Sequence, residues 1–266
     1  MNLDLSSLLA DWPYEPGQIN VRLIQGQDGE PKLQMRVDLG ILQMELGGRP
    51  DGHRPNGYES LLDYFEDVVA DSPGENRQPE EFADQAGEDA RYLSPDDCRL
   101  LREEALQYYH RYIALLVLGD YEGVLRDTTR NMRALDLCRD YAEDEEDRVV
   151  LEQFRPYITM MRARAVASQA ISEQEPKAAI LAIDEGLDEL RRVYELLGDE
   201  MAFEQSSEAA LLRGMRDELS NKLPASQLSE LRERLQAALQ QENYELAAIL
   251  RDELKMMRDD TPKGGA

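Results

Sequence analysis

From Pro95 onward the chain is a succession of helix-forming segments separated by short polar turns. Apolar residues recur there with the period of an amphipathic helix, and the segments end at turns such as Gly119-Asp120 and Gly198-Asp199. The expected helices cover residues 95–118, 121–141, 145–172, 176–197, 199–222, 227–241 and 244–258. This pattern predicts a mostly α fold built from helical hairpins, and it leaves little room for any other architecture in this part of the chain.

Small residues follow three of the turns, namely Gly123, the pair Ala178-Ala179 and the pair Ala247-Ala248. Small side chains let two antiparallel helices approach closely, which is the packing of tetratricopeptide-like arrays. The three instances do not recur at the fixed spacing of about 34 residues that such repeats have. We therefore expect a helical-hairpin array that is only loosely tetratricopeptide-like. Within it, Pro156 predicts either a kink or a helix that begins just before Arg155.

The first 70 residues follow a different pattern. Apolar residues alternate with polar ones over residues 18–46, which predicts two strands joined at residues 26–31 into an antiparallel hairpin, with Gly40 as a bulge or bend. Glycine and proline then dominate residues 47–57, which predicts a loop, and an amphipathic helix is expected over residues 58–70. These features predict a small α+β module at the start of the chain.

The charge of the chain excludes several classes of partner. The chain has 55 Asp and Glu against 30 Lys and Arg, which gives a net charge of -25. Such a chain repels phosphate backbones and anionic lipid surfaces, so we expect neither direct nucleic-acid binding nor membrane binding. The longest apolar run, residues 112–118, is too short to cross a bilayer, and the first residues show no basic segment of a secretory signal. We expect a cytoplasmic protein.

The chain offers few groups for catalysis or metal binding. It contains none of the glycine-rich phosphate loops, zinc-binding histidine pairs or nucleophile elbows that identify common enzymes. Its two histidines, His53 and His110, lie in different modules without a second ligand at metal-binding spacing. Cys98 and Cys138 are expected to be buried thiols rather than a disulfide. We therefore expect no enzyme activity, no catalytic residue, no metal and no cofactor.

Positive charge gathers in the loop at Arg49, His53 and Arg54, where glycines also expose backbone N–H groups. These three residues are the candidates for an anion-binding site. The alternative is structural, with the glycines making turns and the arginines pairing with acids of the following helix. Those acids are Glu59, Asp63 and Glu66.

The strongest motif stands near the C terminus. Leucines and alanines form one stripe of a first helix, Gln241-Glu242-Asn243 makes a turn, and the second helix reads Tyr244-Glu245-x-Ala-Ala-x-Leu-Arg-Asp-x-Leu254. Residues 226–257 resemble the UVR motif of the repair proteins UvrB and UvrC and of the chaperone-associated proteins McsA and ClpC. Asn243 stands where the motif usually has an acid. No helicase, nuclease or zinc-binding Cys-x-x-Cys segment accompanies it.

The resemblance implies association rather than chemistry, because UVR motifs are antiparallel helix pairs that dimerise or pair with a UVR motif on another protein. The residues expected to bind the partner are Leu231, Leu235, Ala238, Tyr244, Ala247, Ala248, Arg251, Asp252 and Leu254. Ala247 and Ala248 are both expected in the seam between the two helices.

The sequence thus predicts four segments: an α+β module (residues 1–70), an acidic flexible linker (71–94), the helical-hairpin array (95–222) and the UVR hairpin (223–260). Our first hypothesis is a protein-interaction or adaptor protein that acts through its UVR motif. The second is an accessory factor of nucleotide excision repair that binds UvrB or UvrC. The third is an enzyme or binding protein for an anionic small molecule at the glycine- and proline-rich loop.

Overall fold

The computed structural model describes residues 4–70, 92–222, 227–240 and 246–251. Contacts divide the chain into two compact units, residues 1–216 and 217–266. Helices predominate in the described parts, and the strands all lie near the N terminus. The expected fold class, mostly α with a small N-terminal α+β module, is confirmed. The four-segment division of the chain stays a prediction.

The N-terminal sheet has three antiparallel strands in the order β1-β2-β3, with β1 at Val21–Gln25, β2 at Pro31–Val37 and β3 at Gly40–Glu45. The expected hairpin of β1 and β2 is confirmed. The expected bulge at Gly40 is wrong, because the chain turns after β2 and Gly40 pairs with Val37 as the first residue of a third strand.

A short helix that the sequence did not predict, α1 (Ser6–Asp11), precedes the sheet. The chain after it contacts the polar side of the sheet, where Arg36 Nε donates to the backbone carbonyl of Trp12 at 2.7 Å. The guanidinium of Arg22 lies 4.1 Å from the centre of the Trp12 ring. Six residues are too few to show a helical period in the sequence, so α1 gave no signal.

The helix expected at residues 58–70 begins later, as α2 (Leu61–Ala70), after a 3-10 turn η1 (Pro55–Gly57). The hydroxyl of Ser60 accepts a hydrogen bond from the backbone N–H of Asp63 at 3.1 Å, which satisfies a free donor at the start of α2. The apolar side of α2 is buried with residues of the array in one core cluster. This core therefore joins the N-terminal residues to the helices that follow the acidic segment.

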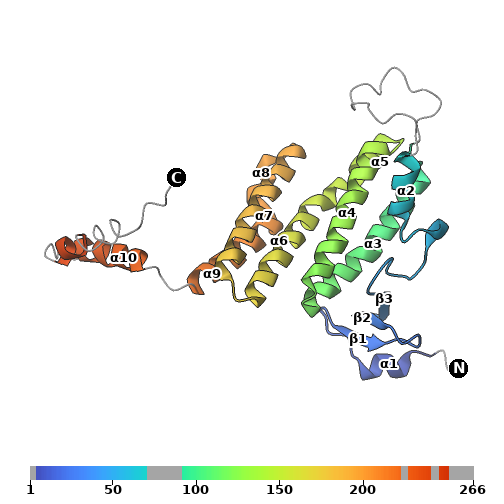
Figure 1. Cartoon of the computed structure of the whole chain (residues 1–266), viewed down its shortest axis with the longest axis horizontal. Helices are drawn as coiled ribbons and strands as arrows, with labels where there is room; N and C mark the ends of the chain where they lie inside the picture. Colours follow the sequence, from blue (N-terminus) through green and yellow to red (C-terminus); the bar gives the residue numbers. More distant parts are fainter. Residues whose placement is uncertain (1–3, 71–91, 223–226, 241–245, 252–266) are drawn as a thin grey trace, which may run out of the picture. The chain divides into compact units, whose positions relative to one another are not determined.

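The array consists of α3 (Pro95–Leu118), α4 (Tyr121–Tyr141), α5 (Glu145–Val150), a 3-10 turn η3 (Glu152–Phe154), α6 (Arg155–Ser172), α7 (Pro176–Leu196), α8 (Glu200–Gln205) and α9 (Ser207–Lys222). The long helices α3, α4, α6 and α7 lie side by side in chain order (Figure 1), and consecutive members of this series are in contact. Local signals fix the ends of α3: Ser94 and Asp97 form a capping box, and Gly119 closes the helix at φ 77°.

Two expected helices are interrupted. The helix expected at residues 145–172 is divided, and α6 begins at Arg155, which is one of the two outcomes that Pro156 allowed. The helix expected at residues 199–222 is divided at Ser206, whose backbone is extended and whose hydroxyl accepts from the N–H of Ala209 at 3.1 Å. A serine can cap a helix as well as continue one, so the sequence alone did not predict this break. Among the described residues, no helix has the length and apolar character of a membrane span.

Candidate functional site

The glycine- and proline-rich loop, residues 47–57, is held against α3 by a buried arginine. Arg111 Nη1 donates to the backbone carbonyls of Glu45 and Gly48 at 3.0 and 2.8 Å. Its Nε and Nη2 donate to the two carboxylate oxygens of Asp127 on α4, at 2.6 and 2.8 Å. Arg111 and Asp127 are both buried. All three guanidinium nitrogens of Arg111 donate hydrogen bonds in this arrangement, so Arg111 has a structural role: it fixes the loop against α3 and α4.

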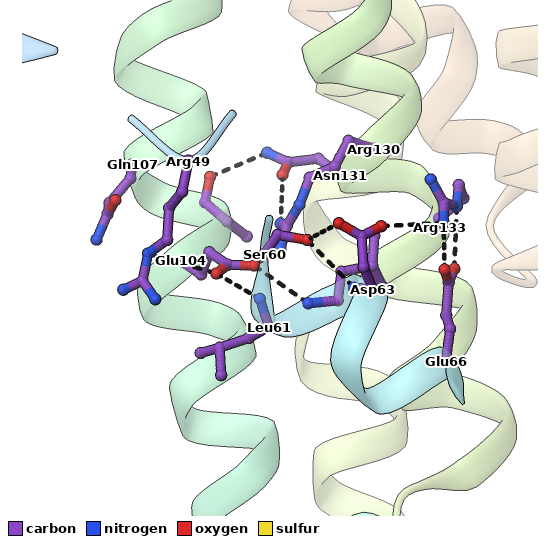
Figure 2. A network of polar contacts seen from close by, with 12 residues as sticks. Arg49, Ser60, Leu61, Asp63, Glu66, Glu104, Gln107, Arg130, Asn131 and Arg133 are labelled. Atoms are coloured by element: carbon purple, nitrogen blue, oxygen red, sulfur yellow. Dashed lines mark hydrogen bonds and ion pairs between the residues drawn. The ribbon is translucent and has the colours of Figure 1, made fainter. Parts of the chain in front are cut away.

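A second buried carboxylate organises the polar network next to the loop (Figure 2). Glu104 of α3 is fully buried and accepts hydrogen bonds from the backbone N–H groups of Leu61, at 2.9 Å, and Leu62, at 3.3 Å. These are the first two residues of α2, so Glu104 caps that helix from a neighbouring helix. The same carboxylate forms an ion pair with Arg130 of α4. Burial lowers the pKa of Arg130 to about 9, which still leaves it charged at neutral pH.

The structure gives both arginines of the candidate anion site a carboxylate partner. Arg54 pairs with Glu59 at 3.7 Å, as the structural alternative expected, and His53 is exposed. Arg49 instead pairs with Asp51 at 3.1 Å and with the buried Glu104 at 3.5 Å. Anion binding by this loop stays a prediction, and these ion pairs favour the structural alternative.

The remaining histidine, His110, lies on α3. His110 of α3 is half-buried, its ring centre lies 5.4 Å from that of Tyr109, and burial lowers the pKa of its imidazole. Within the parts of the chain that the structure describes, no group of three or more His, Cys, Asp and Glu side chains is placed to hold a metal ion.

The C-terminal hairpin has a small core of its own. Its first helix is α10 (Gln227–Gln240), and residues 246–251 are helical as well. Ala238 of α10 is buried together with Ala247 and Leu250 of the following helix, and Leu235 packs against them. Three of the expected partner-binding residues, Leu235, Ala238 and Ala247, therefore lie in the contact between the two helices of the hairpin.

Other expected partner-binding residues lie elsewhere. Ala248 and Arg251 are exposed, so only Ala247 of the alanine pair lies in the seam. The side chain of Leu231 and residues Tyr244, Asp252 and Leu254 lie outside the described residues. Leu250, which the sequence reasoning left out of the site, takes the second buried position. Its place three residues after Ala247 was the signal that could have identified it.

Large apolar side chains remain exposed on the described part of the hairpin. They are Leu239 of α10, 50% exposed, and Leu246 and Ile249 of the following helix, 37% and 63% exposed. We refer to these three side chains as the outer apolar residues.

Residues 225–260 match the family model described as UVR, the UvrB/uvrC motif. The chain carries a UVR motif. No curated protein and no solved structure matches the chain. The UVR motif covers only the C-terminal part of the sequence, and the expected resemblance of this part to UvrB and UvrC is confirmed.

Proposed function

We propose that this protein is a non-enzymatic adaptor that binds a protein partner through its UVR hairpin. The partner is either a second copy of the chain or another protein that carries a UVR motif. The observation that supports the proposal most is the exposure of the outer apolar residues Leu239, Leu246 and Ile249 on a helix pair that carries a UVR motif. A cytoplasmic location, as the sequence suggests, is part of the proposal.

The small size of the hairpin supports the same conclusion. α10 has 14 residues, and isolated helices shorter than about 12 to 15 residues are marginal in water. The described core of the hairpin consists of two alanines and two leucines, which bury little apolar surface. Burial of the outer apolar residues against a partner would supply the stability that this core lacks.

The test is a double variant, Leu239→Glu with Ile249→Glu, in the full chain. Burial of a leucine or isoleucine contributes about 1.5 to 3 kcal/mol, so we expect binding to weaken by roughly tenfold or more. The measurements are sedimentation of the full chain and capture of a second UVR protein. The matched control is Gln236→Glu, which adds a charge at an exposed polar position of α10. Equal association of the double variant and the control would contradict the proposal.

A second candidate function is an accessory role in nucleotide excision repair, and the observation in its favour is the match to the UvrB/uvrC motif. The UVR segments of UvrB and UvrC are the probes that separate it from the first candidate. Binding to either segment that the double variant abolishes would favour the repair role. Self-association with no affinity for either segment would favour an adaptor outside repair.

A further inference from the structure

The two cysteines of the chain both lie in the contact between α3 and α4, which we call the α3–α4 seam. Cys98 is near the start of α3, Cys138 is near the end of α4, and both side chains are completely buried in one core cluster. Both thiols are free. Their burial agrees with the sequence expectation. Their position relative to each other, however, was not visible in the sequence.

The register of the two helices places the cysteines opposite each other. On one side of them, the backbone N–H of Leu93 donates to Tyr141 at 2.8 Å, in an isolated bridge between Leu93 and Ala142. On the other side, Asn131 Nδ2 donates to the carbonyl of Ala105 at 2.9 Å. Along an antiparallel pair of helices, each step forward on α3 corresponds to a step backward on α4. Cys98 lies between Leu93 and Ala105, and Cys138 lies between Asn131 and Tyr141. The two cysteines therefore face each other across the helix pair.

The thiols also contact each other. The neighbouring side chain lowers the pKa of Cys98, and for Cys138 the neighbouring side chain together with burial raises the pKa. The guanidinium of Arg102 favours the thiolate form of Cys98, whereas burial and the carboxylate of Asp147 oppose it.

We propose that Cys98 and Cys138 are a reversible modification site, at which a disulfide oxidant joins the start of α3 to the end of α4. The Cys98 thiolate attacks one sulfur of a small disulfide such as oxidised glutathione, and one glutathione thiolate leaves. The Cys138 thiol then loses its proton and attacks the Cys98 sulfur, and the second glutathione leaves. Two protein thiols are oxidised to one disulfide, and one glutathione disulfide is reduced to two thiols.

The disulfide would stabilise the array. It closes a loop of about 40 residues, which removes conformational entropy from the unfolded chain. For a protein of this size we expect the thermal midpoint of the unit that contains the array to rise by roughly 10 °C. Reduction by a dithiol would reverse the change.

The test incubates the folded full chain with oxidised glutathione and counts free thiols after denaturation. We expect both thiols to be lost, with a mass decrease of two hydrogen atoms, no glutathione adduct and one linked peptide containing Cys98 and Cys138. The single variants Cys98→Ala and Cys138→Ala are the controls, and neither can form the internal disulfide. The thermal midpoint of the oxidised wild-type chain should exceed that of the reduced chain, whereas the two variants should show no such gain.

Three results would overturn the proposal. In the first, the folded chain keeps both thiols over a period that is long enough for oxidised glutathione to oxidise the urea-unfolded chain completely. The second is a product that carries glutathione on each cysteine, and the third is a disulfide between two chains. Each would show that the thiols do not react with each other in the native seam.

Discussion

The carboxylate of Glu104 serves two elements at once. It accepts hydrogen bonds from the first backbone N–H groups of α2 and pairs with Arg130 of α4, while it belongs to α3 itself. The side chain is fully buried, so water cannot replace any of these partners. Removal of one member of a buried ion pair leaves the other charge without compensation, which is far more costly than loss of an exposed pair.

We therefore expect Glu104→Gln to lower the free energy of unfolding by about 3 to 5 kcal/mol. The variant keeps the shape of the side chain but loses its charge and one acceptor oxygen. Urea unfolding followed by circular dichroism measures the change. Glu103→Gln is the matched control, because Glu103 is the preceding residue of α3 and pairs with Arg99 at an exposed position. We expect the control to change the free energy by less than about 1 kcal/mol. Similar effects of the two variants would show that Glu104 does not hold α2 to the array.

Neither role of Glu104 could be predicted from the sequence. Glu104 follows directly after Glu103, and its place three residues after Leu101 and four before Tyr108 puts it on the apolar side of the expected helix, but the sequence does not identify its partners. The partners of Glu104, at the start of α2 and on α4, are distant along the chain. By contrast, the capping box of Ser94 and Asp97 involves residues three positions apart, and the start of α3 was predicted correctly for that reason.

At the scale of the elements, α6 and α7 pack closely at Gly186. Gly186 of α7 is buried, and a Cβ atom added to it would overlap the Cβ atom of Ala163 on α6. The Cδ1 atom of Leu212 on α9 would lie 3.6 Å away. Gly186 therefore allows α6 and α7 to approach each other at this point.

We expect Gly186→Ala to destabilise the protein by roughly 1 to 3 kcal/mol, although alanine favours helix formation, because the two helices must move apart. Gly214→Ala is the control. Gly214 lies inside α9 and is exposed, and an added Cβ atom would meet nothing within 4 Å. There the gain in helix propensity should stabilise the protein by about 0.5 to 1 kcal/mol. Thermal unfolding of the two variants should thus show shifts of opposite sign. A stabilised Gly186→Ala protein would contradict the close approach of α6 and α7.

The alanine pair of the UVR hairpin gives a similar test at the same scale. Ala247 is 6% exposed and lies in the hairpin core, whereas Ala248 is exposed. We expect Ala247→Glu to separate the two helices, since a carboxylate buried in an apolar contact costs several kcal/mol. Ala248→Glu should leave the helix content of the hairpin unchanged. Amide hydrogen exchange at residues 227–251 measures the difference, and equal protection in both variants would contradict the placement of Ala247.

The sequence predicted the hairpin but not which alanine is buried. Ala238 and Leu235 lie on the stripe that the leucine spacing of the first helix indicated, and both contact the second helix. The alanines at 247 and 248 are adjacent and chemically identical, so only the rotation of the second helix decides between them. That rotation depends on the contacts of the second helix with α10. The helical period of one segment does not define these contacts.

At the scale of the whole molecule, the net charge of -25 opposes self-association through any interface. Two copies of the chain repel each other over the distance at which their charges are not screened, and this distance is about 10 Å in 0.1 M salt. Burial of Leu239 and Ile249 against a second copy must overcome the repulsion. Salt weakens the repulsion and leaves apolar contacts almost unchanged.

If a second copy is the partner, we expect the dissociation constant of the dimer to fall as sodium chloride is raised from about 0.05 M to about 0.5 M, a range in which the screening length shortens severalfold. A positively charged partner would give the opposite sign, because salt would then screen an attraction. Analytical ultracentrifugation of the full chain over this range measures the trend. The variant with Leu239→Glu and Ile249→Glu should remain monomeric at every salt concentration, which would assign the salt-dependent association to the UVR hairpin. A dimer that dissociates as salt is added would contradict apolar association between two acidic chains.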